Sequence, residues 1–187
     1  MAAIKLQHGM PENYLDKGIN LIYFGDFHYQ EKAPGKRTDD FHATEFRKAE
    51  LIQELGRKHK VRAFIQSGDF LDKPRISDAF MQQILANWNF KQSVRNREDY
   101  ENGLISKEEY ADRSLEQIPI IGIVGNHEVF GGAIKNYNRT SLKTLNDMGF
   151  INLVGRKKPY LLTMENGRTV AISGQSYDLR LLQDPSN

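Results

Sequence analysis

The stretch LIYFGDFHYQ, residues 21–30, starts as an apolar run and then presents two polar side chains of the kind that bind metals. The apolar and aromatic residues of its first half predict a strand that begins near Ile19. Gly25 breaks the run, and Asp26 and His28 follow it, one residue apart. Carboxylates and imidazoles are common ligands of divalent transition metals. The stretch therefore predicts a strand whose end presents metal ligands.

Two later stretches repeat the order of an apolar strand, a glycine and polar side chains. VRAFIQS, residues 61–67, is followed by GDFLD at 68–72. IPIIGIV, residues 118–124, is followed by GNHE at 125–128. Helical periodicity around these strands predicts helices near residues 41–59, 77–88 and 140–148. Strands that alternate with helices are typical of an α/β fold with parallel pairing.

The last part of the chain changes from α/β toward antiparallel β. A strand is predicted at residues 150–154. Residues 160–173 then have the pattern of a β-hairpin that turns at Asn166 and Gly167. We expect this hairpin to begin a second sheet.

Residues 91–117 interrupt this order with a strongly charged segment. We predict a helical hairpin that turns near Asn102 and Gly103, and Ser106 and Glu109 have the spacing of a capping box. A solvated surface insertion and a lid or partner-docking arm both fit this pattern, and the surface insertion is favoured.

The composition limits the class of protein. The chain has 187 residues, no cysteine and a formal net charge of +2. This length suits one domain, and the lack of cysteine excludes disulfides and thiolate metal sites. The small charge does not argue for nucleic-acid binding by itself, and the basic residues at 156–158 are favoured as a solvated face over a phosphate contact. No apolar run suits a signal peptide or a spanning helix, so the sequence predicts a cytoplasmic protein without a membrane partner.

The polar side chains after the three strands are expected to meet, because the carboxyl ends of parallel strands lie at one edge of a sheet. A glycine before each motif would allow a sharp turn and a close ligand. Carboxylates mixed with imidazoles suit Mn, Fe or Zn better than Mg, and two such ions about 3.5–4 Å apart can activate a water molecule against a phosphoester. Each motif alone is also compatible with an ordinary turn. The residues concerned are Asp26, His28, Asp69, Asp72, Asn126 and His127.

Taken in order, GDFH, GDFLD and GNHE resemble the first three motifs of the calcineurin-like metallophosphoesterases, and the resemblance covers nearly the whole chain. RTDDF at 37–41, KP at 73–74 and INLVG at 151–155 are similar to the branch that contains double-strand-break-repair exonucleases and their phage and bacterial relatives. The resemblance implies an α/β fold, a β-sandwich flanked by helices, of which residues 1–187 would be the N-terminal portion, with the charged insertion at about 91–117.

The resemblance also implies a role for each motif residue. Two divalent ions would bind to Asp26, His28, Asp69 and Asn126, with Asp69 shared between them. Mn is the favoured metal, with Fe and Zn as alternatives. His127 would act on the leaving group as an acid or charge stabiliser, without binding metal.

Two acidic residues are assigned supporting roles. Asp72 would hold the metal ligands in place without itself being one of them. Glu128 stands where the family commonly has Asp, and its hypothesised task is to orient His127. We expect the remaining histidines away from the metals: His8, His42 and His59.

The function that the resemblance implies is metal-dependent hydrolysis of phosphoesters, with DNA as the preferred substrate and an ATPase subunit or a homodimer as partner. Family members complete the site with histidines near the C-terminus, and this chain has none after His127. Either residues 1–187 are a fragment, which we favour, or the chain is a non-catalytic scaffold or partner subunit. In the fragment interpretation, residues 1–187 alone would be nearly inactive, and an intact protein would need Mn or a similar ion.

Overall fold

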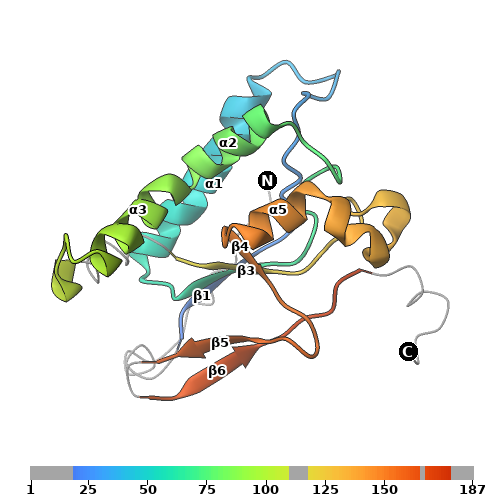
Figure 1. The fold of residues 1–187 in the computed structure, drawn as a ribbon. Coiled ribbons are helices and arrows are strands. Elements are labelled where there is room, and N and C mark those ends of the chain that lie inside the picture. The colour runs from blue at the N-terminus through green and yellow to red at the C-terminus, as the bar shows by residue number, and fades with distance from the viewer. Residues whose placement is uncertain (1–18, 110–117, 165–166, 178–187) are drawn as a thin grey trace, which may run out of the picture.

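The computed structural model describes residues 19–109, 118–164 and 167–177, which form a mixed α/β fold (Figure 1). The larger sheet has four parallel strands in the order β1-β2-β3-β4. Each strand is thus hydrogen-bonded to the next one along the chain, as the sequence predicts for the first three. Their bounds are Leu21–Phe24 for β1, Ala63–Gln66 for β2, Ile120–Gly122 for β3 and Ile151–Leu153 for β4.

Antiparallel pairing begins only after β4. Strands β5, Tyr160–Thr163, and β6, Thr169–Ile172, form a separate two-stranded antiparallel sheet. The predicted hairpin is therefore confirmed, and part of its turn, residues 165–166, lies outside the described residues. Gly167 has a φ of 79°, the left-handed conformation that favours glycine in a turn.

The helices that start at residues 41 and 78 each follow a residue whose side chain accepts a hydrogen bond from the first turn. Asp40 accepts one from the N–H of Ala43 and Ser77 from that of Phe80, so Ser77 is the cap of the second helix. The predicted helices near 41–59, 77–88 and 140–148 are confirmed. The bounds are Phe41–Lys58 for α1, Asp78–Asn87 for α2, Phe90–Glu101 for α3 and Ser141–Asp147 for α5, with short 3₁₀ turns η2 at Phe130–Gly132 and η3 at Ile134–Arg139.

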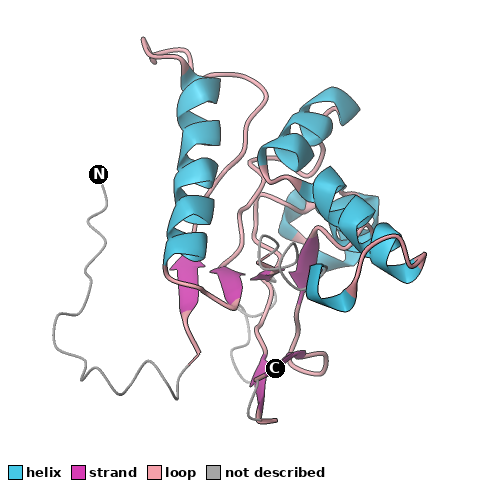
Figure 2. Cartoon of the chain, turned by 90° about the vertical axis from the view of Figure 1, so that its left-hand side faces the viewer, coloured by secondary structure: helices cyan, strands magenta, loops and turns pink. Residues whose placement is uncertain are grey.

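The strand order explains why the helices cover one face of the larger sheet (Figures 1 and 2). Connections between parallel strands are right-handed, and here each one steps to the next strand in the same direction. All crossover helices then fall on the same face. The opposite face is left for β5 and β6, which lie against it and complete a sandwich of two sheets.

Two hydrophobic clusters fill these two faces, because neighbouring residues of a strand point to opposite sides. Phe64 and Ile120 belong to the cluster under the helices. Ala63 and Ile121, one residue away from each, belong to the cluster between the sheets, together with Leu162 of β5. The middle strands β2 and β3 are thus covered on both faces, whereas Leu21 and Tyr23 of β1 remain exposed.

The charged segment at 91–117 begins inside a helix. α3 covers the first arm of the predicted helical hairpin, and Gly103, with a φ of 70°, follows its end. The hydroxyl of Ser106 accepts a hydrogen bond from the N–H of Glu109, 3.0 Å away, as the capping spacing predicts. The rest of the second arm, residues 110–117, lies outside the described residues. Within the described residues, none of the helices is both long and apolar enough to cross a membrane.

Glu45 is a buried carboxylate on α1, next to the loop that follows β1. It is 3% exposed, and its Oε1 accepts a hydrogen bond from the N–H of Gln30 at 3.3 Å. Burial raises the pKa of Glu45 from 4.5 to about 7, although the Gln30 N–H and the charge of Lys48 oppose this. Between pH 4.5 and 7 the folded protein therefore holds a proton that the unfolded chain releases, so stability falls as pH rises through this window.

We predict that Glu45→Gln makes the stability of the protein less dependent on pH. Gln keeps an oxygen for the Gln30 N–H and carries no charge to desolvate. The melting temperature should rise at pH 8, by roughly 2–4 °C for each kcal/mol recovered, and should change little at pH 4. Thermal unfolding across this range measures the effect, with Glu54→Gln, an exposed position of the same helix, as the control. If the melting temperature of Glu45→Gln fell with rising pH as steeply as that of the wild type, the pKa of Glu45 would not be raised in the folded protein.

Candidate metal centre

The loops after β1 and β2 are joined by backbone hydrogen bonds beyond the end of the sheet. The N–H of His28 donates to the carbonyl of Asp69, and that of Tyr29 to Phe70, both at 2.9 Å. The N–H of Asp72 returns to the carbonyl of Tyr29 at 3.1 Å. The first and second motifs therefore run side by side, which brings their polar side chains together.

Tyr29 fastens this pair of loops to the helical layer. Its side chain is fully buried, and its hydroxyl donates to Oδ1 of Asn87 at 3.2 Å and accepts from Nε1 of Trp88 at 3.0 Å. Burial raises the pKa of Tyr29 far above its ordinary value of 10, so the hydroxyl stays protonated. The residue next to His28 is thus an anchor, which limits how far the loop can move.

The third loop is tied to the second by two carboxylates. The N–H of His127 donates to Oδ1 of Asp69 at 2.9 Å. Glu128 is fully buried, and its carboxylate accepts hydrogen bonds from the N–H of Leu71 at 3.0 Å and of Gly125 at 2.8 Å. Burial raises the pKa of Glu128 to about 7, although these backbone groups oppose the shift.

The described contacts of Glu128 do not include the ring of His127, and the hypothesis that it orients this ring stays a prediction. Its carboxylate serves the backbone of the second and third loops instead. The ring of His127 is held by Asp72, whose carbonyl lies 3.2 Å from Nδ1 of His127. The side chain of Glu128 therefore joins the second and third loops through their backbone N–H groups.

The glycines before the motifs solve different steric problems. A Cβ at Gly125 would lie 2.2 Å from Oδ1 of Asp69, so only glycine fits against this carboxylate. A Cβ at Gly25 would lie 2.6 Å from the hydroxyl of Ser67. Gly68 has a φ of +100° and makes the sharp turn that the sequence predicts. Room for a close neighbour is therefore the main role of Gly25 and Gly125.

Three of the predicted metal ligands have left-handed backbones themselves. The φ angles are 46° for Asp26, 52° for His28 and 55° for Asp69. This conformation is uncommon for residues with a side chain, although Asp and His adopt it more often than most. Such backbone geometry is concentrated at functional sites, where the surrounding structure imposes it.

Two groups of side chains in the described residues have the spacing of a metal site. In the first, the ligand atoms of Asp26, His28 and Asp69 all lie within 4.8 Å of one another. In the second, the same holds for His28, Asp72 and His127. The groups share His28, so the two sets of candidate ligands overlap in one site.

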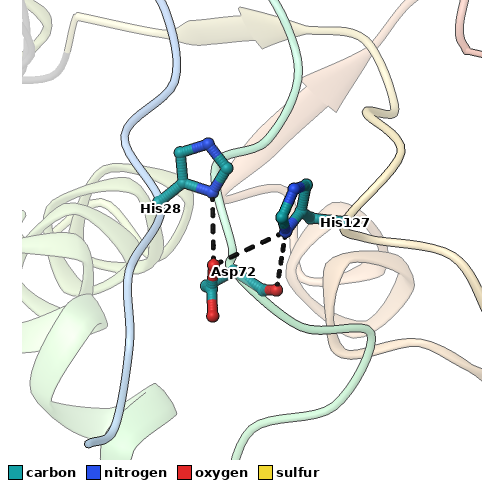
Figure 3. Close-up of side chains that lie close together, drawn as sticks. All are labelled: His28, Asp72 and His127. Atoms are coloured by element: carbon teal, nitrogen blue, oxygen red, sulfur yellow. Dashed lines mark hydrogen bonds and ion pairs between the residues drawn. The ribbon is translucent and has the colours of Figure 1, made fainter. Parts of the chain in front are cut away.

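Figure 3 shows Asp72 between the two histidines of the second group. Its Oδ1 lies 3.4 Å from Nδ1 of His28 and 3.5 Å from Nδ1 of His127. The two rings are nearly perpendicular, with centroids 4.7 Å apart. Asp72 therefore contacts both imidazoles, a closer involvement than the supporting role assigned from the sequence.

The remaining predicted residues lie in or away from this site as follows. Asn126 is exposed in the loop between Gly125 and His127. His42 lies in the first turn of α1, where its Nδ1 is 4.0 Å from Oε2 of Glu45, and His59 caps the end of that helix. Neither histidine belongs to the two groups found in the described residues. His8 lies outside the described residues.

The donor atoms present fit a divalent transition metal ion. Carboxylate oxygens and imidazole nitrogens from different loops are a mixed set that such ions accept. Nδ1 of His28 is buried, makes no hydrogen bond within the described part of the chain and lies 3.4 Å from Oδ1 of Asp72, so this imidazole stands against a carboxylate. The first group supplies three protein donors, which leaves coordination positions for water or a substrate oxygen.

A comparison with protein families gives an independent result. Residues 19–185 match the model of the calcineurin-like phosphoesterases. No curated protein matched the chain. The match covers most of the 187 residues and includes all three motifs. It identifies the family, and the exonuclease branch stays a prediction. With the mixed α/β fold and the grouped carboxylates and imidazoles described above, the chain belongs to the calcineurin-like phosphoesterase family.

Proposed function

We propose that this phosphoesterase cleaves phosphodiester bonds of DNA with the help of two divalent ions. The observation that carries the proposal is the convergence of Asp26, His28 and Asp69 next to His127 and Asp72. The family supports metal-dependent hydrolysis of phosphoesters, and the donor types favour Mn, with Fe and Zn as alternatives. An ATPase partner, a homodimer and a cytoplasmic location stay predictions.

Each motif contributes to the binding of the ions. Asp26 and His28 would hold one ion, Asn126 the other, and Asp69 both. Two ions about 3.5–4 Å apart would activate a water molecule and stabilise charge on the phosphoryl oxygens. Asp69 is well suited to a shared position, because its Oδ1 already accepts the N–H of His127 and is fixed in direction.

His127 is in a position to donate a proton to the leaving oxygen. Its side chain is 43% exposed, and its Nδ1 faces Asp72. An acidic partner at one ring nitrogen fixes the ring and leaves the other nitrogen, Nε2, for the substrate. Such acid catalysis is typically worth about 10²–10⁴ in rate.

A basic turn supports DNA as the substrate. β4 is parallel to β3, so the chain leaves β4 at the same edge of the sheet that carries the metal ligands. The turn that follows is closed by hydrogen bonds between Gly155 and Lys158, and the side chains of Arg156, Lys157 and Lys158 are all exposed. Three cations at this edge of the sheet would contact phosphates that flank the cleaved bond.

We predict that replacing Arg156, Lys157 and Lys158 together by Gln weakens DNA binding without harming the chemistry. The KM for DNA should rise, and the salt dependence of binding should fall by about 0.9 in log–log slope for each phosphate that the protein no longer neutralises. Hydrolysis of a small phosphodiester with an uncharged leaving group should be unchanged. Lys107→Gln, an exposed cation of the charged segment, is the control. Unchanged DNA binding in the triple variant would remove this turn from the interface.

The proposed substrate is tested by comparing linear DNA with small phosphomonoesters in the intact protein with Mn. Cleavage of DNA that stops with a chelator and returns with Mn is the expected result. Strong monoesterase activity without DNA cleavage would make the protein a phosphatase. A folded protein that binds no Mn and hydrolyses neither substrate would instead be the non-catalytic scaffold.

A further inference from the structure

A second cavity lies at the opposite edge of the larger sheet from the metal ligands. It has a volume of about 280 Å³ and opens between the amino ends of β3 and β4 and helices α1 and α3. It shares no residue with the candidate metal centre. Its lining comes from Gln53, Arg57, Phe64, Trp88, Phe90, Arg97, residues 118–120, Gly149, Phe150, Asn152 and Tyr160.

Aromatic side chains contribute to its wall beside polar groups. The rings of Phe90 and Phe150 meet edge to face with centroids 5.5 Å apart, and those of Trp88 and Phe150 do so at 6.3 Å. Trp88 and Phe90 are partly exposed, so they offer ring surface to the cavity as well as to the core. Flat apolar surfaces of this kind favour a planar ring as a ligand.

Two guanidinium groups lie at the cavity without acidic partners. Arg57 is in the last turn of α1, and Arg97 is on α3. Both are exposed, and neither forms an ion pair with a carboxylate of the described residues. Among the described residues that line the cavity there is no Asp or Glu. The described part of the lining is therefore cationic, since none of its residues carries a negative charge.

We propose that this cavity binds a planar aromatic anion of the size of a nucleoside monophosphate. Arginine forms paired, charge-assisted hydrogen bonds with phosphate, and aromatic rings stack on a base. The volume is close to the lower end of the range for small-molecule sites, which suits one nucleotide and not a polymer. A ligand here would contact α1, α3 and the strands whose other ends carry the metal ligands.

The proposal is tested by the fluorescence of Trp88, which is the only tryptophan of the chain. Adenosine monophosphate is titrated into the protein in the presence of a chelator, so that neither the metal centre nor turnover contributes. Saturable quenching is expected. Adenosine, which lacks the phosphate, should bind at least about tenfold more weakly, because a hydrogen bond to a charged group is worth about 1.5–3 kcal/mol.

Variants separate this cavity from the rest of the surface. Arg57→Gln and Arg97→Gln should each weaken adenosine monophosphate at least about tenfold. Arg95 is an exposed arginine on α3, as is Arg97, but it does not line the cavity. Arg95→Gln should therefore bind adenosine monophosphate like the wild type. Absence of saturable quenching, equal affinity for adenosine, or unchanged binding by both cavity variants would overturn the proposal. Because no step depends on hydrolysis, this result is independent of the proposed DNA cleavage.

Discussion

Asp69→Asn is expected to reduce phosphoester hydrolysis by the intact protein more than any other aspartate substitution. The loss should exceed about a hundredfold, since even residues that only support a metal ligand cost about 10–100-fold. Asn has nearly the same shape and keeps an oxygen for the N–H of His127, so the loops should stay joined. The substitution removes the negative charge and one metal-binding oxygen at the position that both ions would share.

Bound Mn per protein and the hydrolysis rate together measure this effect. Asp26→Asn should reduce the rate less than Asp69→Asn, because it removes a ligand of one ion alone. Asp147→Asn is the matched control, since this exposed aspartate pairs with Lys143 on α5, outside both metal groups. If Asp69→Asn were as active as the wild type after chelation and return of Mn, Asp69 would not be the shared ligand.

His127→Ala is expected to lose turnover by about 10²–10⁴-fold while most metal binding remains. His127 lies on the exposed side of the site, and Asp72 holds its Nδ1, which leaves Nε2 for the leaving oxygen. The loss should be largest for substrates with poor leaving groups and small for nitrophenyl esters, because a good leaving group needs no proton.

The second metal group offers an alternative result for His127→Ala, in which His127 is a metal ligand. His28, Asp72 and His127 have the spacing to hold an ion by themselves. If His127→Ala loses one equivalent of metal together with activity for all leaving groups, His127 is a ligand and the acid assignment is wrong. Asp72→Asn then should show the same loss of metal, because it completes that group.

The sequence predicted the order of the elements and the convergence of the motifs for a simple physical reason. Parallel strands end at a common edge, so a polar residue after each strand must approach the others. Asp26, His28 and Asp69 meet as this rule expects. The pairing partner of β4 could not be predicted, because apolar patterning does not indicate which strand lies beside it. The second sheet lies on the opposite face because the right-handed connections place all helices on the first one.

The contacts between loops could not be predicted in the same way. Asp72 reaches both histidines because the backbone of the second loop pairs with that of Tyr29, a bond pattern that carries no side-chain signal. Glu128 bonds to backbone N–H groups of two loops, whereas motif comparison suggested an imidazole partner. The second cavity could not be predicted either, because its lining residues are scattered between positions 53 and 160 and no local sequence pattern connects them.

The left-handed backbone of Asp26, His28 and Asp69 lowers the stability of the folded protein at positions that are predicted to be needed for activity. Each residue holds a conformation that glycine adopts without steric cost, and such backbone strain is of the order of 1–3 kcal/mol. Selection for heat resistance alone should therefore enrich glycine or asparagine at Asp26 and His28 and remove these predicted metal ligands, whereas Asp69 also joins two loops through the N–H of His127. Laboratory evolution of a more thermostable protein should therefore keep these three residues unchanged. Stability can instead be gained at positions such as Glu45, which belongs to neither metal group.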